Sequence, residues 1–261
     1  MLSLEGKVAI ITGGNSGIGR GMAELFAKAG AKLCLVGQNE ERGASAVQMV
    51  KDAGSEAFFV KADVSNAQEV KAFVEETVER YGQLNIMVNN AGRIAQGTVV
   101  DLELEKWDKV IRNNLYGVFY GSKYAAAQMI KQGKGGRIVN VSSIHAKISE
   151  PDACAYTATK GGIEAFTRTL ASEVAPYGIT ANILAPGAVY TEINKDMYTP
   201  AVVAALEKRI PVGKIAYPKD IAHAALYMVS DESWFMTGSR VCLDGGHEMD
   251  GSLPGAAFWK E

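Results

Sequence analysis

The sequence predicts an α/β fold, a single doubly wound domain of about seven parallel strands with helices on both faces. Short apolar runs alternate with helix-length segments along the whole chain. Most of these runs are continuously apolar rather than alternating, which is typical of parallel strands covered on both sides by helices. No repeat or proline-rich linker marks a boundary, so we expect one domain over residues 1–261.

Seven apolar runs are strand candidates, and six longer segments fit between them as helices. The predicted strands are Val8–Thr12, Leu33–Val36, Ala57–Val60, Ile86–Asn89, Arg137–Ser142, Thr180–Leu184 and Val241–Leu243. The predicted helices are Gly19–Ala29, Glu40–Ala53, Ala67–Tyr81, a long stretch within Leu104–Lys131, Ala155–Val174 and Lys219–Ser230. This order predicts right-handed crossovers between parallel strands.

One segment, at about residues 186–211, interrupts the alternation of strands and helices. It follows a predicted strand and mixes apolar with polar residues. Ligands of open α/β sheets bind at the carboxyl ends of the strands. We therefore expect residues 186–211 to form a substrate lid; the alternative is a surface excursion without a role.

Composition and charge exclude several classes of function. The net charge of −2 leaves no basic excess for nucleic-acid phosphates or anionic lipid, so neither nucleic acid nor membrane is an expected partner. No apolar stretch approaches the ~20 residues of a membrane span. The three cysteines lie far apart without metal-ligand spacing. We expect no metal site, no disulfide scaffold and a cytoplasmic location.

The first predicted strand runs directly into a glycine-rich turn, TGGNSGIG at residues 12–19, which opens a helix. Glycines let a pyrophosphate approach the backbone, and the helix N-terminus offers free N–H groups to the phosphates. Gly13, Gly17 and Gly19 give the spacing G-x-x-x-G-x-G, which differs from the common dinucleotide fingerprint. The turn predicts a dinucleotide site; the alternative is a tight connection with no ligand.

The end of the second predicted strand bears on the choice of dinucleotide. An acid usually stands there to bind the adenosine ribose. Here Gly37 takes that place, and Gln38 follows without a basic side chain. Because no carboxylate repels a 2′-phosphate, the sequence favours NADP(H) over NAD(H).

Tyr156 and Lys160 stand four residues apart at the start of a predicted helix, so their side chains share one face. A nearby ammonium lowers the pKa of a phenol, and we expect Lys160 to act on Tyr156 in this way. Such a tyrosine can exchange a proton with an alcohol oxygen. Ser143 follows the fifth predicted strand and can donate to that oxygen. The alternatives are an amphipathic helix surface and a turn serine.

Together these residues resemble the short-chain dehydrogenase/reductase family, and the resemblance spans nearly the whole chain. Ser143 stands thirteen residues before Tyr156, as in that family. The resemblance implies a Rossmann-type fold and a set of cofactor contacts along the chain. These are Gly13, Asn15, Ser16, Gly17, Ile18, Gly19, Gln38, Asp63, Val64, Asn90, Ala91, Gly92, Tyr156, Lys160, Pro186, Gly187, Val189 and Thr191.

The resemblance also implies catalytic roles for Asn114, Ser143, Tyr156 and Lys160. Tyr156 is then the acid/base, Lys160 lowers its pKa and holds the ribose, and Ser143 orients the substrate oxygen. Asn114 sustains a chain of water molecules. A homotetramer is implied, with the helices around Asn114 and Tyr156 at the interface. A C-terminal tail at residues 247–261 extends beyond the usual end of the family.

The substrate is expected to be a small secondary alcohol or its ketone. His145, Glu150, Asp152 and Arg93 near the site favour a polyol or sugar acid. Apolar residues of the lid favour an apolar substrate instead: Met197, Tyr198, Val202, Val203 and Leu206. The alternatives are a reductase of 3-oxoacyl thioesters, a dinucleotide-binding regulator without turnover, and a structural subunit.

Overall fold

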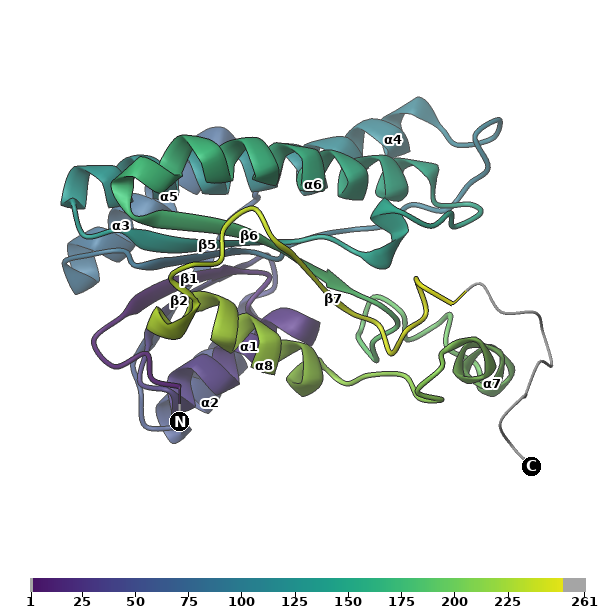
Figure 1. Cartoon of the computed structure of the whole chain (residues 1–261), viewed down its shortest axis with the longest axis horizontal. Helices are drawn as coiled ribbons and strands as arrows, with labels where there is room; N and C mark the ends of the chain where they lie inside the picture. The colour runs from purple at the N-terminus through teal and green to yellow at the C-terminus, as the bar shows by residue number, and fades with distance from the viewer. Residues whose placement is uncertain (1, 251–261) are drawn as a thin grey trace.

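The computed structural model describes residues 2–250 as one α/β domain built on a single sheet (Figure 1). Its seven strands are β1 (Val8–Thr12), β2 (Lys32–Gly37), β3 (Ala57–Lys61), β4 (Ile86–Asn89), β5 (Gly136–Val141), β6 (Ile179–Pro186) and β7 (Arg240–Leu243). They lie in the order β3-β2-β1-β4-β5-β6-β7, and every neighbouring pair is parallel. The predicted fold class and its strands are confirmed.

Helices cover both faces of the sheet and enclose two hydrophobic clusters (Figure 1). One face carries α3 (Ala67–Tyr81), α5 (Gly117–Gln132) and α6 (Cys154–Val174), and the other carries α1 (Gly17–Lys28), α2 (Glu40–Asp52) and α8 (Pro218–Val229). Side chains alternate across a strand. Ile10 of β1 therefore packs in one cluster, while its neighbours Ala9 and Ile11 pack in the other.

The helix predicted within Leu104–Lys131 is divided in three. A short α-helix, α4 (Leu104–Val110), leads into a π-helix at Ile111–Tyr116, and α5 follows. The spacing of apolar residues does not reveal this π-helix, because the wider turn changes the backbone hydrogen bonding and not the types of residue. Such turns are frequent at functional sites. This one contains Asn114, which is fully buried.

The segment at 186–211 contains a further helix, α7 (Pro200–Arg209), beyond the carboxyl end of β7 (Figure 1). Thr199 accepts a hydrogen bond from the Val202 backbone N–H, and Pro200 occupies the first helical position. Both are favourable helix starts. Within residues 2–250, no helix is both long and apolar enough to cross a membrane.

Candidate active site

The glycine-rich turn leaves the N-terminus of α1 open to an anion. Gly13 and Gly17 have φ angles of 67° and 50°, which side chains rarely adopt. A Cβ on Gly19 would collide with the carbonyl oxygen of Gly13. Ser16 precedes α1 without a side-chain cap, and no acid lies in the first turn of the helix. These features fit a dinucleotide pyrophosphate.

The segment after β4 is fastened to this turn through Thr12. The Thr12 hydroxyl oxygen accepts from the backbone N–H groups of Asn90 and Ala91, at 2.9 and 3.0 Å. The Asn90 side chain in turn donates to the Thr12 carbonyl at 2.9 Å. A Cβ on Gly13 would lie 2.8 Å from Asn90 Nδ2, so only glycine fits this approach. Residues predicted to contact the cofactor thus converge from β1 and β4.

The expected adenosine end of the site lies past β2 and β3. Asn15 packs over Gly37, where an added Cβ would lie 2.6 Å from Asn15 Oδ1. Gln38 is exposed. Asp63 accepts from the Ser65 backbone N–H at 2.9 Å and from its hydroxyl at 2.8 Å. The Asp63 carboxylate thus shapes the turn into α3.

Ser143 and Tyr156 meet at the carboxyl end of β5. Ser143 Oγ accepts from the His145 backbone N–H at 3.2 Å, which fixes the oxygen of the hydroxyl. Burial raises the pKa of Tyr156, and a hydrogen bond with Ser143 opposes that rise. The phenol is therefore protonated at neutral pH. Sequence reasoning identified both residues but expected the opposite shift in pKa.

Lys160 lies one turn further along α6, with Nζ 5.3 Å from the centre of the Tyr156 ring. Its side chain is 4% exposed, and Nζ donates to the Val141 carbonyl oxygen at 2.8 Å. Burial lowers the pKa of Lys160 to about 8. The predicted pairing of the two side chains is present, but the expected lowering of the tyrosine pKa is not. Desolvation of the phenol is the largest cause of the raised Tyr156 pKa, because burial disfavours the charged phenolate.

Asn114 connects the π-turn to the loop after β4. Its Oδ1 accepts from the Arg93 backbone N–H, and its Nδ2 donates to the Arg93 carbonyl, both at 2.9 Å. Nδ2 also approaches the Thr159 hydroxyl at 3.2 Å. A Cβ on Gly92 would lie 3.7 Å from Asn114 Oδ1 and 3.8 Å from Lys160 Nζ, so both groups border one space. The Arg93 side chain, expected near the crevice, is exposed.

The segment after β6 lies over the glycine-rich turn. The methyl carbon of Thr191 would lie 3.4 Å from a Cβ on Gly17. Further along, Met197 Sδ accepts from Gln96 at 3.2 Å, which joins the segment 186–211 to the loop after β4. A cleft of about 660 Å³ opens between this segment, α1 and α8, bordered by Gly17 and Thr191. Ser143 and Tyr156 do not line this cleft.

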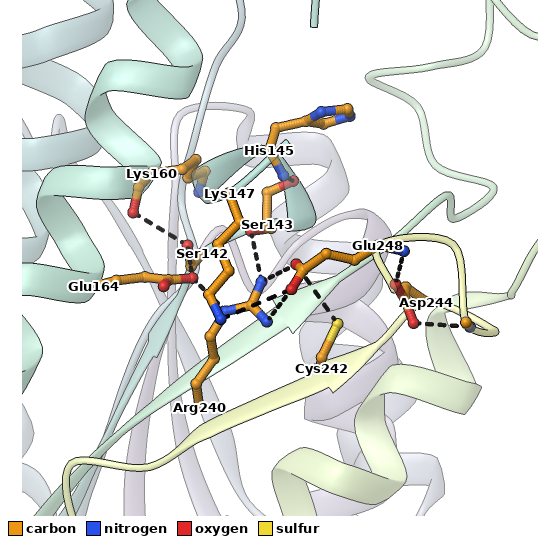
Figure 2. Close-up of polar contacts among 11 residues, drawn as sticks. Ser142, Ser143, His145, Lys147, Lys160, Glu164, Arg240, Cys242, Asp244 and Glu248 are labelled. Atoms are coloured by element: carbon orange, nitrogen blue, oxygen red, sulfur yellow. Dashed lines mark hydrogen bonds and ion pairs between the residues drawn. The ribbon is translucent and has the colours of Figure 1, made fainter. Parts of the chain in front are cut away.

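An ion cluster behind the serine was missed by sequence reasoning (Figure 2). Arg240 of β7 donates to Glu164 of α6 at 2.7 Å and forms a second ion pair with Glu248. The three side chains are only 14%, 6% and 16% exposed. Ser142 donates to Glu164 at 3.1 Å, and Arg240 Nη2 approaches the Ser143 carbonyl at 3.5 Å. The cluster therefore braces the strand end that carries Ser143.

The arrangement has known relatives. A family model described as enoyl-(acyl carrier protein) reductase matches residues 13–248. The chain belongs to the short-chain dehydrogenase/reductase family. It is thus an oxidoreductase of a family that uses NAD(P). The matched span contains the glycine-rich turn, Ser143, Tyr156 and Lys160.

Relatives within the short-chain dehydrogenase/reductase family carry different names. A 3-oxoacyl-(acyl-carrier-protein) reductase from Chlamydia pneumoniae is 37% identical, covering 94% of this chain and 98% of the relative. Glucose 1-dehydrogenase 2 from Bacillus subtilis is 36% identical, covering 93% and 95%. The crystal structure of a gluconate 5-dehydrogenase from Burkholderia cenocepacia, in complex with NADP and tartrate, has a TM-score of 0.90. It is 34% identical and covers 95% and 97%.

Replacing Lys160 by methionine is expected to stabilise the cofactor-free protein at neutral pH. The folded pKa of Lys160 is about 8, below the ordinary 10.5, so the unfolded chain binds more protons between these values. The cost of burying the ammonium is full below pH 8 and disappears as the pH rises toward 10.5. The gain in unfolding free energy should be about 3 kcal/mol at pH 7 and small at pH 10.5.

Urea denaturation of both proteins at several pH values measures this difference. Lys51→Met, on the exposed surface of α2, is the control and should show no pH-dependent gain. A constant difference between Lys160→Met and the native protein from pH 7 to 10.5 would contradict the prediction.

Proposed function

We propose that this protein transfers a hydride between NADP(H) and a secondary alcohol or its ketone. One observation supports the proposal: Ser143, Tyr156 and Lys160 lie together, and Lys160 borders Gly92, next to the segment that binds Thr12 of the glycine-rich turn. The bound cofactor supplies or accepts the hydride at its nicotinamide ring. The protein's own residues hold the substrate oxygen and move its proton.

In this mechanism Tyr156 donates a proton to the ketone oxygen or removes one from the alcohol. Its raised pKa keeps the phenol protonated at neutral pH, which suits donation to a ketone. Ser143 orients the same oxygen, since its own oxygen is already held by the His145 backbone N–H. Lys160 holds the ribose, and Asn114 sustains the chain of water molecules behind it.

The preference for NADP(H) is supported by the lack of an acid at the end of β2. Gly37 stands there beneath the Asn15 side chain, and the exposed Gln38 carries no charge. The nearby Arg20 donates to the Ser45 hydroxyl, at 3.3 Å, rather than to a carboxylate. A 2′-phosphate would meet no carboxylate at the end of this strand.

Exchanging Gln38 for arginine is expected to raise the ratio of kcat/KM for NADP to that for NAD by roughly tenfold or more. An exposed guanidinium at this place adds a charge-assisted hydrogen bond to the 2′-phosphate. Gln38→Glu should lower the ratio, because it places a repulsive carboxylate there. Steady-state kinetics with both cofactors measures the ratio. If the two variants had equal NADP-to-NAD ratios of kcat/KM, Gln38 would not contact the adenosine end of the cofactor.

Three further features of the proposal concern the context of the site. Residues 186–211 act as a substrate lid, supported by the contact between Gln96 and Met197. The protein is a homotetramer, supported by Tyr116 and Phe119, which are 41% and 43% exposed around the start of α5. It acts in the cytoplasm, which the cysteine pattern favours. The end of the predicted tail, residues 251–261, lies outside the described residues.

A reductase of 3-oxoacyl thioesters is the second candidate, since one relative at 37% identity bears that name. The relatives named for glucose and gluconate favour the alcohol dehydrogenase. The test is a screen of alcohols, ketones and a 3-oxoacyl thioester with NADP(H) and NAD(H). We expect turnover of an alcohol–ketone pair. Failure of both cofactors to bind at millimolar concentration would overturn the proposal.

A further inference from the structure

Two histidines near the catalytic serine have ring nitrogens without a hydrogen-bond partner among residues 2–250. These are Nδ1 of His145 and both ring nitrogens of His247, all three shielded from solvent. Buried polar atoms are nearly always paired, so an unpaired group calls for an explanation. Leaving such groups unpaired costs stability, which a substrate that hydrogen-bonds to them would recover.

The two histidines come from segments about a hundred residues apart in sequence. His145 lies in a short 3-10 helix (Ile144–Ala146) that begins directly after Ser143. His247 lies in the turn after β7, where Asp244 accepts from the backbone N–H groups of Gly246 and Glu248. Arg240 connects this turn to Ser143, because it forms an ion pair with Glu248 and approaches the Ser143 carbonyl oxygen (Figure 2).

Glu150 interacts with both rings and with a tyrosine of the segment 186–211. Glu150 Oε2 lies 3.6 Å from His145 Nε2 and interacts electrostatically with His247. It also interacts with Tyr198 of the lid, which in turn interacts with the catalytic Tyr156. His145 thus lies two residues after Ser143, and Glu150 links it to His247 and to Tyr198.

The charge state of His247 indicates what kind of group its ring can bind. Burial and the nearby Arg209 lower the pKa of His247, while Asp244 and Glu150 act in the other direction. The ring is therefore neutral at pH 7. A neutral imidazole offers one donor and one acceptor, the pair of roles that a hydroxyl group matches. The nearby Glu150 carboxylate can also accept a hydrogen bond from a hydroxyl group.

We propose that His145 and His247 bind hydroxyl groups of a polyhydroxylated substrate, on carbons beyond the one that reacts. The inference rests on the proposed function, because the reacting carbon is placed by Ser143 and Tyr156. A neutral polyol and a sugar acid share this chemistry. A site built to hydrogen-bond hydroxyl groups rejects analogues that lack them far more strongly than an apolar pocket rejects added hydroxyls.

The test measures kcat/KM for sorbitol and gluconate, and for their ketone products, beside 2-butanol and cyclohexanol as alcohols with a single hydroxyl. Each is assayed with the native protein, His145→Leu and His247→Leu. His223→Leu is the matched control, because His223 is exposed on α8, where its Nδ1 contacts the Lys219 carbonyl oxygen. Sorbitol and gluconate distinguish a neutral polyol from a sugar acid.

We expect the native protein to prefer a polyhydroxylated substrate. Each site variant should lose roughly three- to tenfold in kcat/KM for it, mainly through KM, with the single-hydroxyl alcohols unaffected. His223→Leu should behave as the native protein. A native preference for single-hydroxyl alcohols, or equal losses for both classes, would overturn the inference and leave the proposed function standing. No turnover of any probe with either cofactor would overturn both.

Discussion

Replacement of Tyr156 by phenylalanine is expected to lower kcat/KM by roughly 10²- to 10⁴-fold, the usual contribution of a positioned acid/base. The change removes one oxygen from a residue whose pKa is set by burial and by its hydrogen bond to Ser143. The ring and its packing beside Lys160 remain. Binding of NADP(H), measured by fluorescence titration, should therefore change little.

Tyr177→Phe provides the control, because Tyr177 is 52% exposed at the end of α6 and carries no role in the proposed reaction. The comparison also separates an enzyme from a dinucleotide-binding regulator or a structural subunit. If Tyr156→Phe kept more than about a tenth of the activity, a group other than Tyr156 would have to move the proton.

Exchange of Arg240 for methionine is expected to lower the free energy of unfolding by about 3–5 kcal/mol. Its guanidinium lies between Glu164 and Glu248, and all three side chains are at most 16% exposed. Removing the cation leaves the Glu164 carboxylate buried without a countercharge. Chemical denaturation measures the loss, and adding Glu164→Gln to the variant should recover part of it, because the unpaired charge is then gone.

Arg42→Met is the matched control for this loss. Arg42 also forms an ion pair, with Glu192 at 3.5 Å, but both side chains are more than half exposed. Exposed pairs contribute about 0–1 kcal/mol. If Arg240→Met and Arg42→Met lowered the free energy of unfolding equally, the buried ion pairs of Arg240 would contribute no more stability than an exposed pair.

Local sequence patterns were enough for much of the architecture. The apolar runs of β1 and β6 are fully buried in the structure, as continuous apolar strands are in a doubly wound sheet. The spacing of Tyr156 and Lys160 placed both on one face of α6 because the helical period is short and regular. The π-turn at Ile111–Tyr116 could not be predicted, since an added residue in a helix leaves no mark on composition.

The sequence by itself therefore determined the seven strands, the glycine-rich turn and the tyrosine–lysine pair, because each of these features depends on residues close to one another in the sequence. Only the tertiary structure decided that Arg240 meets Glu164, that Asn114 holds the loop at Arg93, and that His247 and His145 interact electrostatically. These contacts join residues on different elements, so they depend on the strand order of the sheet. The same packing reversed the expected shift of the Tyr156 pKa, because burial depends on every element around a side chain.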